Sequence, residues 1–408
     1  MRIHAYPALR PRPDVVGQVA APPYDTVDTA EAAQLAAGNP LSFLHVNHSE
    51  IDLPAGTDLY ADAVYAKAAE NLANFKKNGW LVREDRPLMY LYAQTMGAHV
   101  QTGLVCCAHI DDYIQNVIKK HELTRKDKED DRTKHTATIN ANIGPVFIAY
   151  RDIAEIRAAL APIPKKSAPL YDFVDELHVR HQVWPVENAA EIEKLFADKV
   201  PVSYIADGHH RSASAVRVGA ERRAATPKHT GNEEYNWFLS VLFPASELKI
   251  LPYNRAVKDL NGLSPEEFLK EIRAIFTVTD NADPSPKSPR HVSMYFGGKW
   301  YGLSWPEVKS SNPVDLLDVS TLQNGVLHPL LGIDDPRTNH RIKFIGGIRG
   351  PQELVRLVDQ KGYAVAFSMY PTTVDQLMAI ADAGQIMPPK STWFEPKLRT
   401  GLLSHELD

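Results

Sequence analysis

The sequence predicts an α+β protein built from two parts, and three stretches support this prediction. Two apolar runs within residues 87–110 are joined by a short loop at Gly97, which predicts a hairpin and the start of a sheet. Residues 202–225 combine an apolar strand-like run, an Asp-Gly pair and a helix-forming run. Between residues 342 and 384, strand-like and helix-like runs alternate, which indicates a second sheet covered by helices.

The predicted boundary between the two parts follows residue 255. Residues 1–255 are expected to contain a mixed sheet and the functional site, and residues 256–408 are expected to form an α/β part. The tail, MPPKSTWFEPKLRTGLLSHEL, is too regularly patterned for a frayed end. We therefore expect it to fold back toward the site.

Local patterns predict the individual elements. Apolar stripes at helical spacing and capping signals predict helices at 28–37, 59–79, 153–161, 189–196, 212–225, 264–276, 314–331, 352–360 and 373–384. Apolar runs of strand length predict strands at 39–49, 87–94, 101–110, 142–150, 202–205, 236–244, 342–345 and 363–370, with two strands each in 168–184 and 292–305. The first helix is expected to be capped by Asp25 or Thr26.

Composition narrows the class of protein. The chain has 408 residues, of which 44% are hydrophobic and 23% charged, as in an ordinary soluble protein of two or more domains. Its net charge of −5 argues against a non-specific nucleic-acid binder. The start lacks an apolar signal core, and no apolar run has the roughly 18 residues of a membrane span. We expect a cytoplasmic protein without nucleic-acid or membrane partners, and its oligomeric state stays open.

The cysteines are expected to be buried thiols. Cys106 and Cys107 are adjacent in a predicted strand. Neighbouring residues of a strand point to opposite faces, so a disulfide between these two is not expected. Two ligands also do not make a zinc site, and burial as small hydrophobic side chains is the better prediction.

The turn after the 202–205 run carries the strongest functional signal. Its residues are Asp207, Gly208, His209, His210, Arg211 and Ser212. A glycine admits a backbone shape closed to other residues, and the first amides of a helix lack intrahelical partners, so an anion can dock there. An acid, two imidazoles and a guanidinium suit phosphate handling, with Asp207 binding a metal or a hydroxyl and Arg211 an oxyanion. The alternative is that Asp207 caps the helix and the histidines are ordinary surface residues.

A second signal lies in the charged run KKHELTRKDKEDDRTKH, residues 119–135. Glu122, next to His121, supplies a possible general base. Lys128 and Arg132 lie one helical turn apart and are predicted to face one anion. Such a charge run is also typical of a solvated helix or loop, and that alternative stays open.

Two further polar clusters lie in the predicted C-terminal part. One contains Asp334, Asp335, Arg337, Asn339 and His340 and precedes a predicted strand. The other lies in the tail, where Lys390 is a secondary candidate for a phosphate contact. Solvated surface charge is an equal alternative for Lys390, as it is for the two cations of the charged run.

Five motifs in order give the chain a family resemblance. They are APPYD, KKHELT with KEDDR, NIGPVF, ADGHHR and MPPKSTWFEPK, which together span nearly the full chain. The chain resembles the domain-of-unknown-function 1015 family, which is similar to the ParB/sulfiredoxin superfamily and to its free-serine kinases. The resemblance implies a ParB/sulfiredoxin-like N-terminal part with a phosphate or nucleotide site at Asp207–Arg211.

The resemblance also implies roles for particular residues. Glu122 of the His121-Glu122 pair matches the residue thought to take the proton from the serine hydroxyl. Asp207, Gly208, His209 and Arg211 match the box that holds the phosphates and the substrate. This implies a kinase of serine metabolism that phosphorylates L-serine with ATP or ADP and Mg²⁺. The residue types of the turn make Asp207 the predicted metal ligand.

Other functions of the superfamily fit the sequence less well. Sulfiredoxin chemistry requires a cysteine in the box, where this chain has His209. A ParB-like DNA clamp predicts a basic helix-turn-helix region, which the acidic balance argues against. The alternative that stays open is a regulatory protein of ParB-like type that binds a nucleotide or a phosphometabolite without turnover, for which Arg211 would suffice and Glu122 would be dispensable.

Overall fold

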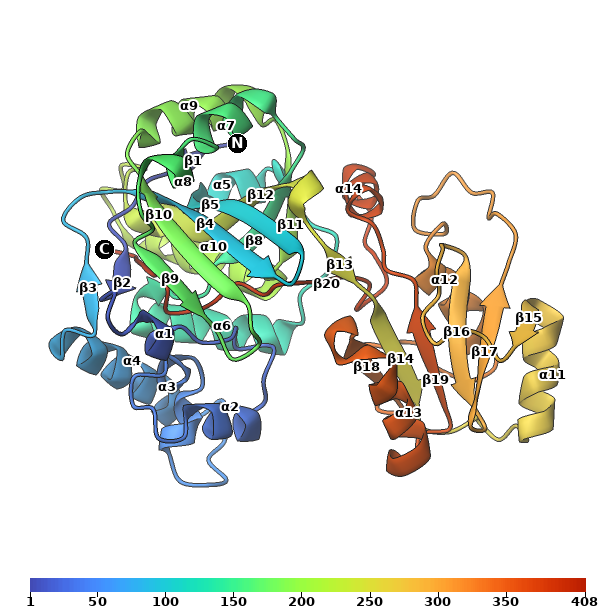
Figure 1. Ribbon diagram of the computed structural model, residues 1–408. Helices are drawn as coiled ribbons and strands as arrows, with labels where there is room; N and C mark the ends of the chain where they lie inside the picture. The colour runs from blue at the N-terminus through green and yellow to red at the C-terminus, as the bar shows by residue number, and fades with distance from the viewer. The chain divides into compact units, whose positions relative to one another are not determined.

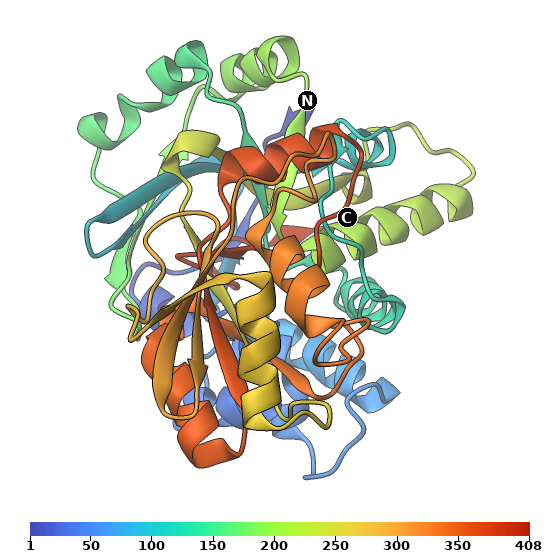
Figure 2. The same cartoon turned by 90° about the vertical axis from the view of Figure 1, so that its right-hand side faces the viewer.

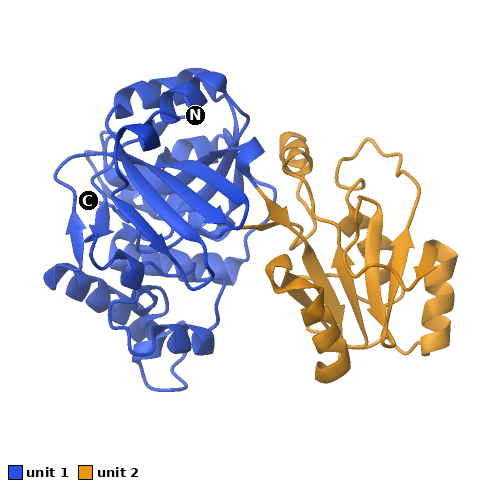
Figure 3. Ribbon diagram, in the orientation of Figure 1, with its two compact units in different colours: residues 1–248, 396–408 blue, residues 249–395 orange.

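The computed structural model describes all 408 residues (Figure 1; Figure 2 gives a second view). The chain forms two compact units (Figure 3). Unit 1 comprises Met1–Leu248 and Pro396–Asp408, and unit 2 comprises Lys249–Glu395. Sequence reasoning had placed the division at residue 255 and had counted the whole C-terminal stretch with the second part.

Unit 1 contains the larger set of elements. Its helices are α1 (Val16–Val19), α2 (Thr29–Ala36), α3 (Leu44–Asn47), α4 (Asp62–Lys77), α5 (Ile110–Ile114), α6 (Lys126–Ile139), α7 (Ala154–Leu160), α8 (Ile163–Lys166), α9 (Ala189–Lys199) and α10 (His209–Ala225), with 3₁₀ turns η1 (Ser49–Asp52), η2 (Glu234–Asn236) and η3 (Ala245–Glu247). Its strands are β1 (Ile3–His4), β2 (Leu9–Pro11), β3 (Leu81–Arg83), β4 (Met89–Met96), β5 (His99–His109), β6 (Ile118–Lys119), β7 (Ala141–Asn142), β8 (Val146–Tyr150), β9 (Tyr171–Val174), β10 (Arg180–Val186), β11 (Ser203–Asp207), β12 (Trp237–Pro244) and β21 (His405–Glu406).

A nine-stranded mixed sheet organises unit 1, as the sequence predicted. Its order is β6-β11-β8-β12-β5-β4-β10-β9, and β1 also pairs with β5. The β6–β11 and β8–β12 pairs are parallel, and the other pairs are antiparallel. The predicted hairpin is β4 and β5, with Tyr90 opposite Val105. Because β6 and β11 run in the same direction at the sheet edge, the residues after both strands emerge at the same end.

Two large apolar clusters stabilise unit 1. One joins the sheet to α7 and α9 and includes Cys106, Ile148 and Phe196. The other joins α2, α3 and α4 and includes Phe43 and Leu72. Both cysteines are buried and free, as predicted.

Several predictions of local structure in unit 1 are wrong. Residues 39–49 contain the helical turn α3 instead of a strand, because Leu44 and Val46 pack together into the α2–α4 cluster. Helix α2 is capped by Asp28, which forms a capping box with Glu31. Helix α10 begins at His209 and not at residue 212, so the polar box forms its first turn.

Unit 2 is built on a second sheet. Its strands are β13 (Ile250–Leu251), β14 (Tyr253–Val257), β15 (Thr277–Asp280), β16 (His291–Phe296), β17 (Lys299–Ser304), β18 (Ile342–Gly346), β19 (Val365–Met369) and β20 (Trp393–Phe394). Its helices are α11 (Pro265–Ile275), α12 (Asp318–Leu322), the π-helix η4 (Gln323–Leu327), the 3₁₀ turn η5 (Gly347–Arg349), α13 (Gly350–Lys361) and α14 (Val374–Asp382).

The second sheet has helical cover, as predicted, but its pairing is not that of an α/β fold. The order is β15-β17-β16-β19-β14-β18, and every pair is antiparallel. Tyr295 packs in the cluster formed with α13, while its neighbour Phe296 meets Phe268 of α11, seen in front of the strands in Figure 2. Adjacent strand residues point to opposite faces, so α11 and α13 cover opposite faces of the sheet.

Residues 396–408 form a strap across unit 1. β21 pairs with β7, and the backbones of Leu9 and Ser404 exchange two hydrogen bonds. The backbones of Thr400 and Ala21 do the same. None of the helices in the structure combines the length and apolar character that a membrane span requires.

Candidate functional site

The turn between β11 and α10 depends on Gly208. Its φ is 92°, in the left-handed region that favours glycine. A Cβ atom added there would lie 3.0 Å from the guanidinium carbon of Arg211. The backbone N–H of Gly208 donates to the Asp207 carboxylate at 2.7 Å, and no side chain caps the helix. The glycine therefore lets Arg211 fold back over the start of its own helix.

Asp207 is held between two cations. Lys397 of the strap donates to its carboxylate at 2.7 Å, and a terminal nitrogen of Arg211 lies 3.7 Å away. Burial by itself would raise the pKa of Asp207, but the positive charges of Lys397 and Arg211 outweigh this effect and hold the pKa well below its usual value. Asp207 is therefore a carboxylate whose charge the chain itself neutralises.

This arrangement bears on Asp207 as a magnesium ligand. Mg²⁺ in proteins is usually bound by one or two carboxylates together with water and substrate phosphates. Here the carboxylate already accepts from Lys397 and from the Gly208 backbone. The residues around Asp207 therefore fit a lysine-bound carboxylate better than a Mg²⁺ ligand, and the magnesium assignment stays a prediction.

Arg211 is nearly enclosed, with 10% of its side chain exposed. It donates to the carbonyl of Pro145, and Asp25 lies 3.9 Å from one of its terminal nitrogens. Its Nε atom is buried without a hydrogen-bond partner. Burial opposes the charged form, but the carboxylates of Asp25 and Asp207 more than compensate, so the pKa of Arg211 is raised. The guanidinium thus keeps its charge and has a donor to spare.

His121 and Glu122 meet His209 at the same end of the sheet. The rings of His121 and His209 make an edge contact with centroids 4.5 Å apart. One ligand atom from each of the three residues lies within 4.8 Å of the others. Burial lowers the pKa of His121 to about 4 and that of His209 well below its usual value, so both imidazoles are neutral at neutral pH. The two stretches that the sequence analysis singled out therefore adjoin, because β6 and β11 are parallel neighbours.

The two predicted cations of α6 differ in their surroundings. Arg132 pairs with Asp131 at 2.8 Å and lies over the ring of Tyr24, 4.3 Å from its centroid. Lys128 instead donates to the hydroxyl of Tyr60 at 3.0 Å. Arg132 and Arg211 line one cavity, whose walls also include Tyr24, Asn47, Ser214 and Thr400. Lys128 is not among the residues that line it.

The other residues of the box have contacts within the chain. The His210 ring accepts a hydrogen bond from the backbone N–H of Arg125 at 3.0 Å, which holds the loop before α6 against α10. The Ser212 hydroxyl is fully buried and donates to the His209 carbonyl at 3.0 Å. These contacts support the turn, and a role in nucleotide binding for either residue stays a prediction. Lys390 belongs to unit 2, and its contact with a phosphate stays a prediction.

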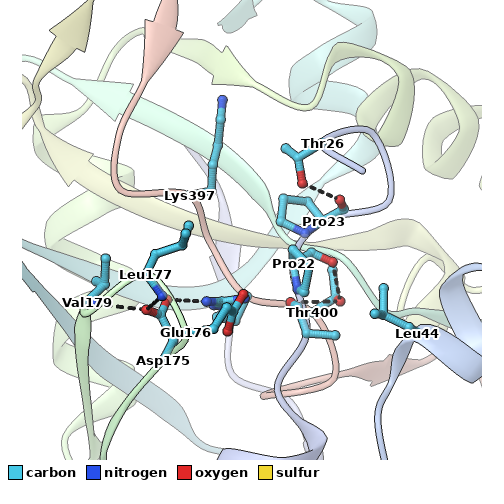
Figure 4. A network of polar contacts seen from close by, with 12 residues as sticks. Pro22, Pro23, Thr26, Leu44, Asp175, Glu176, Leu177, Val179, Lys397 and Thr400 are labelled. Atoms are coloured by element: carbon cyan, nitrogen blue, oxygen red, sulfur yellow. Dashed lines mark hydrogen bonds and ion pairs between the residues drawn. The ribbon is translucent and has the colours of Figure 1, made fainter. Parts of the chain in front are cut away.

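The strap supplies site residues that the sequence analysis did not select. Arg399 pairs with Asp175 and, at 2.8 Å, with Glu176, while Thr400 donates to the carbonyls of Ala21 and Pro22 (Figure 4). These contacts fix the strap at the two residues that follow Leu398 and so help to position Lys397 beside Asp207. Lys397 stands in the quoted tail motif, but only its contact with Asp207, far away in sequence, distinguishes it from other surface lysines.

The comparison with protein families gives a clear result. The model of a family described as a protein of unknown function, DUF1015, matches residues 3–320. The chain is a member of this family. No curated protein matches its sequence.

Solved structures resemble this DUF1015 protein only distantly. A free serine kinase variant in complex with AMP has a TM-score of 0.36 at 11% identity, covering 71% of this chain and 87% of the other. SbnI with a C-terminal truncation, from Staphylococcus aureus, has a TM-score of 0.37 at 11% identity, covering 72% and 85%. Another free serine kinase variant, in complex with ADP, has a TM-score of 0.35 at 14% identity, covering 72% and 88%. Scores at this level carry no argument about function, and the predicted ParB/sulfiredoxin likeness stays a prediction.

Proposed function

We propose that this DUF1015 protein is a phosphotransferase that moves a phosphoryl group from ATP or ADP to the hydroxyl of a small molecule, with L-serine as the first acceptor to test. The observation that carries the proposal is the meeting of two groups of residues in unit 1. Arg211 lines a cavity with Arg132, and His209, two residues before Arg211, adjoins His121 and Glu122. The first turn of α10 thus adjoins two arginines that are candidates for phosphate binding and a carboxylate that is a candidate base.

The phosphate end of the proposed site is the cavity at Arg211. Arg211 has an unpartnered Nε donor and lines this cavity together with Arg132, so both guanidiniums can bind phosphate oxygens. The start of α10 is not capped by a side chain, and its backbone N–H groups are further candidate donors. Both guanidiniums already face carboxylates, Asp131 at 2.8 Å and Asp207 and Asp25 at 3.7 and 3.9 Å. Because the carboxylates lie farther from Arg211 than Asp131 lies from Arg132, Arg211 loses less interaction energy with the protein when it binds a phosphate.

The proposed chemistry places Glu122 as the base. Its carboxylate accepts the proton of the acceptor hydroxyl while that oxygen forms a bond to the terminal phosphorus of the nucleotide. The bond from phosphorus to the bridging oxygen breaks, and the shortened nucleotide leaves with the electron pair. Arg211 and Arg132 bind the charge on the transferred group. Mg²⁺ would accompany the nucleotide, and no step here depends on where it binds.

A product search tests this function. The purified full chain is incubated with ATP or ADP, Mg²⁺ and a pool of free amino acids and small polyols, and phosphorylated products are detected by mass spectrometry. We expect phosphoserine, and we expect Glu122→Gln to lower turnover by about 10²–10⁴-fold with nucleotide affinity unchanged. Turnover that survives Glu122→Gln would refute the base assignment.

The same experiment addresses the alternative of a regulatory protein. Saturable nucleotide binding without any product would favour a protein that senses a nucleotide or phosphometabolite. Arg132 and Lys397 are already paired with Asp131 and Asp207, whereas Arg211 keeps an unpartnered donor, and the regulatory alternative needs only Arg211. The cytoplasmic location and the absence of nucleic-acid partners stay predictions.

A further inference from the structure

The cluster of His121, Glu122 and His209 has the composition of a metal site. It offers two imidazoles and one carboxylate, with one ligand atom from each residue within 4.8 Å of the others. With metal–ligand bonds of about 2.1 Å, two ligands of one tetrahedral ion lie roughly 3.4 Å apart. Binding an ion therefore requires a closure of at most about 1.4 Å between these side chains, which side-chain rotation can supply.

A second, independent observation concerns His209. The residue is 7% exposed, and its Nε2 atom is buried without a hydrogen-bond partner. Buried polar atoms in folded proteins are almost always hydrogen-bonded, so an orphaned imidazole nitrogen indicates a missing partner. A metal ion is a partner that such a nitrogen accepts, and Glu122 and His121 lie beside it to complete the site.

Other histidines of unit 1 that face carboxylates differ from His209. His405 lies 2.7 Å from Glu234, and His181 lies 2.9 Å from Asp175. In both contacts the imidazole and the carboxylate are hydrogen-bonded to each other, so neither is oriented for a shared ion. His4 and His405 also flank one carboxylate, Glu234, but the ligand atoms of these three residues do not all lie within 4.8 Å of one another.

We infer that His121, Glu122 and His209 bind a divalent transition-metal ion of the Zn²⁺ or Fe²⁺ class. Imidazole ligands favour these ions, whereas Mg²⁺ and Ca²⁺ prefer sites made of oxygen atoms. A hydrogen bond between His121 and the backbone of Ile205 supports its ring in the way that outer contacts orient metal-ligating histidines.

Three protein ligands leave a coordination position open for water. If the proposed phosphotransferase function holds, the acceptor hydroxyl is the natural ligand at that position. The metal site itself does not depend on that function. A carboxylate that binds through one oxygen keeps the second, so Glu122 remains able to accept a proton.

Metal titration of the full chain tests the inference. Chelator-treated protein is titrated with Zn²⁺ by calorimetry and with Co²⁺ by visible absorption, without nucleotide or acceptor. We expect one equivalent of either ion to bind, no competition from millimolar Mg²⁺, and at least a 10-fold loss of affinity in Glu122→Gln and His209→Gln. His4→Gln is the matched control, because His4 also faces a glutamate, and it should bind as the unaltered chain does.

The two variants differ in the burial of the altered residue. Glu122 is partly exposed, so Glu122→Gln remains informative if the buried His209→Gln variant fails to fold by circular dichroism. An absence of saturable Zn²⁺ binding, or binding that both variants leave unchanged, would overturn the site. Phosphoryl transfer by metal-free protein that binds no Zn²⁺ would overturn the metal site and leave the phosphotransferase function standing. One bound equivalent of Zn²⁺ in a protein without transferase activity would support the metal site and overturn the phosphotransferase function.

Discussion

Unit 1 and unit 2 both contain pairs of oppositely charged side chains, but the pair Arg399–Asp175 of unit 1 is buried and the pair Arg337–Asp335 of unit 2 is exposed. Arg399 and Asp175 are 3% and 5% exposed in their side chains, and Arg211 is 10% exposed. In unit 2, the pair Arg337–Asp335 is 49% and 40% exposed. Removing a charge from water is costly unless partners compensate, so a buried cluster marks a place where the fold maintains charge at a cost in stability.

Two polar runs that are alike in residue types differ in burial. The polar runs at 207–212 and at 334–340 each combine an acid, an arginine and a histidine. The first forms the initial turn of a helix that packs into unit 1, and the second forms an exposed turn before β18. Burial, and not residue type, therefore decides which cluster can carry chemistry.

Truncating the buried arginine of unit 1 should lower the free energy of unfolding far more than truncating an exposed arginine of unit 2. Arg399→Ala leaves the buried Asp175 carboxylate with fewer compensating charges and should lower the free energy of unfolding by about 3–5 kcal/mol. Arg337→Ala, at an exposed pair, should change it by less than about 1 kcal/mol. Chemical denaturation of the full chain measures both. Equal losses would mean that burial of charge does not distinguish the units.

Nucleotide affinity should separate Arg211 from the exposed arginines. Arg211→Gln removes a guanidinium from the proposed phosphate cavity and should weaken binding of ATP or ADP by roughly 10- to 100-fold, since charge-assisted hydrogen bonds contribute about 1.5–3 kcal/mol. Arg341→Gln, whose pair with Asp259 lies in unit 2, is the matched control and should leave the affinity unchanged. Unaltered affinity in Arg211→Gln, measured by calorimetry, would exclude the cavity as the phosphate site.

Two glycines, one in each unit, have the same backbone requirement but different surroundings. Gly208 and Gly362 both have positive φ, 92° and 72°, so alanine at either position should cost about 1–2 kcal/mol. Only at Gly208 would the new methyl group press on Arg211, whereas nothing lies within 4 Å at Gly362. We therefore expect Gly208→Ala alone to weaken nucleotide binding, and a similar loss in Gly362→Ala would indicate a general effect of strain.

The smallest effects are opposite responses of the two units to acid. Burial would raise the pKa of Glu234, but its contacts with His4 and His405 lower it to about 2, so this part of unit 1 is fully stabilised above pH 4.5 and loses stability as the pH falls toward 2. Burial raises the pKa of Asp318 in unit 2 to about 6, so unit 2 loses stability as the pH rises from about 4 to 6.

Hydrogen exchange of peptides from each unit, corrected for intrinsic rates, measures both slopes. Asp318→Asn should flatten the response of unit 2 and leave that of unit 1 unchanged. Glu234→Gln should remove the acid response of unit 1 without affecting unit 2. A common pH response in the two units would show that other groups control it.

Most of the local elements could be predicted from the residues alone. The apolar stripe at 59–79 gave α4, the run at 87–110 gave the β4–β5 hairpin, and Ser264 with Glu267 gave the capping box of α11. These features depend on side-chain period and turn chemistry within a few residues, which are visible without any fold. Where short apolar runs were ambiguous, as at 39–49, packing decided for a helical turn.

The pairing of charged groups, in contrast, depends on contacts between residues far apart in the sequence. Lys397 reaches Asp207 from 190 residues away, and Arg399 reaches Asp175 from 224 residues away. His121 meets His209 because β6 and β11 are parallel neighbours, and no local pattern around either histidine predicts that strand pairing. The sheet order that creates these contacts is the cooperative result of burying many apolar side chains at once, so no local pattern around the charged residues could specify it.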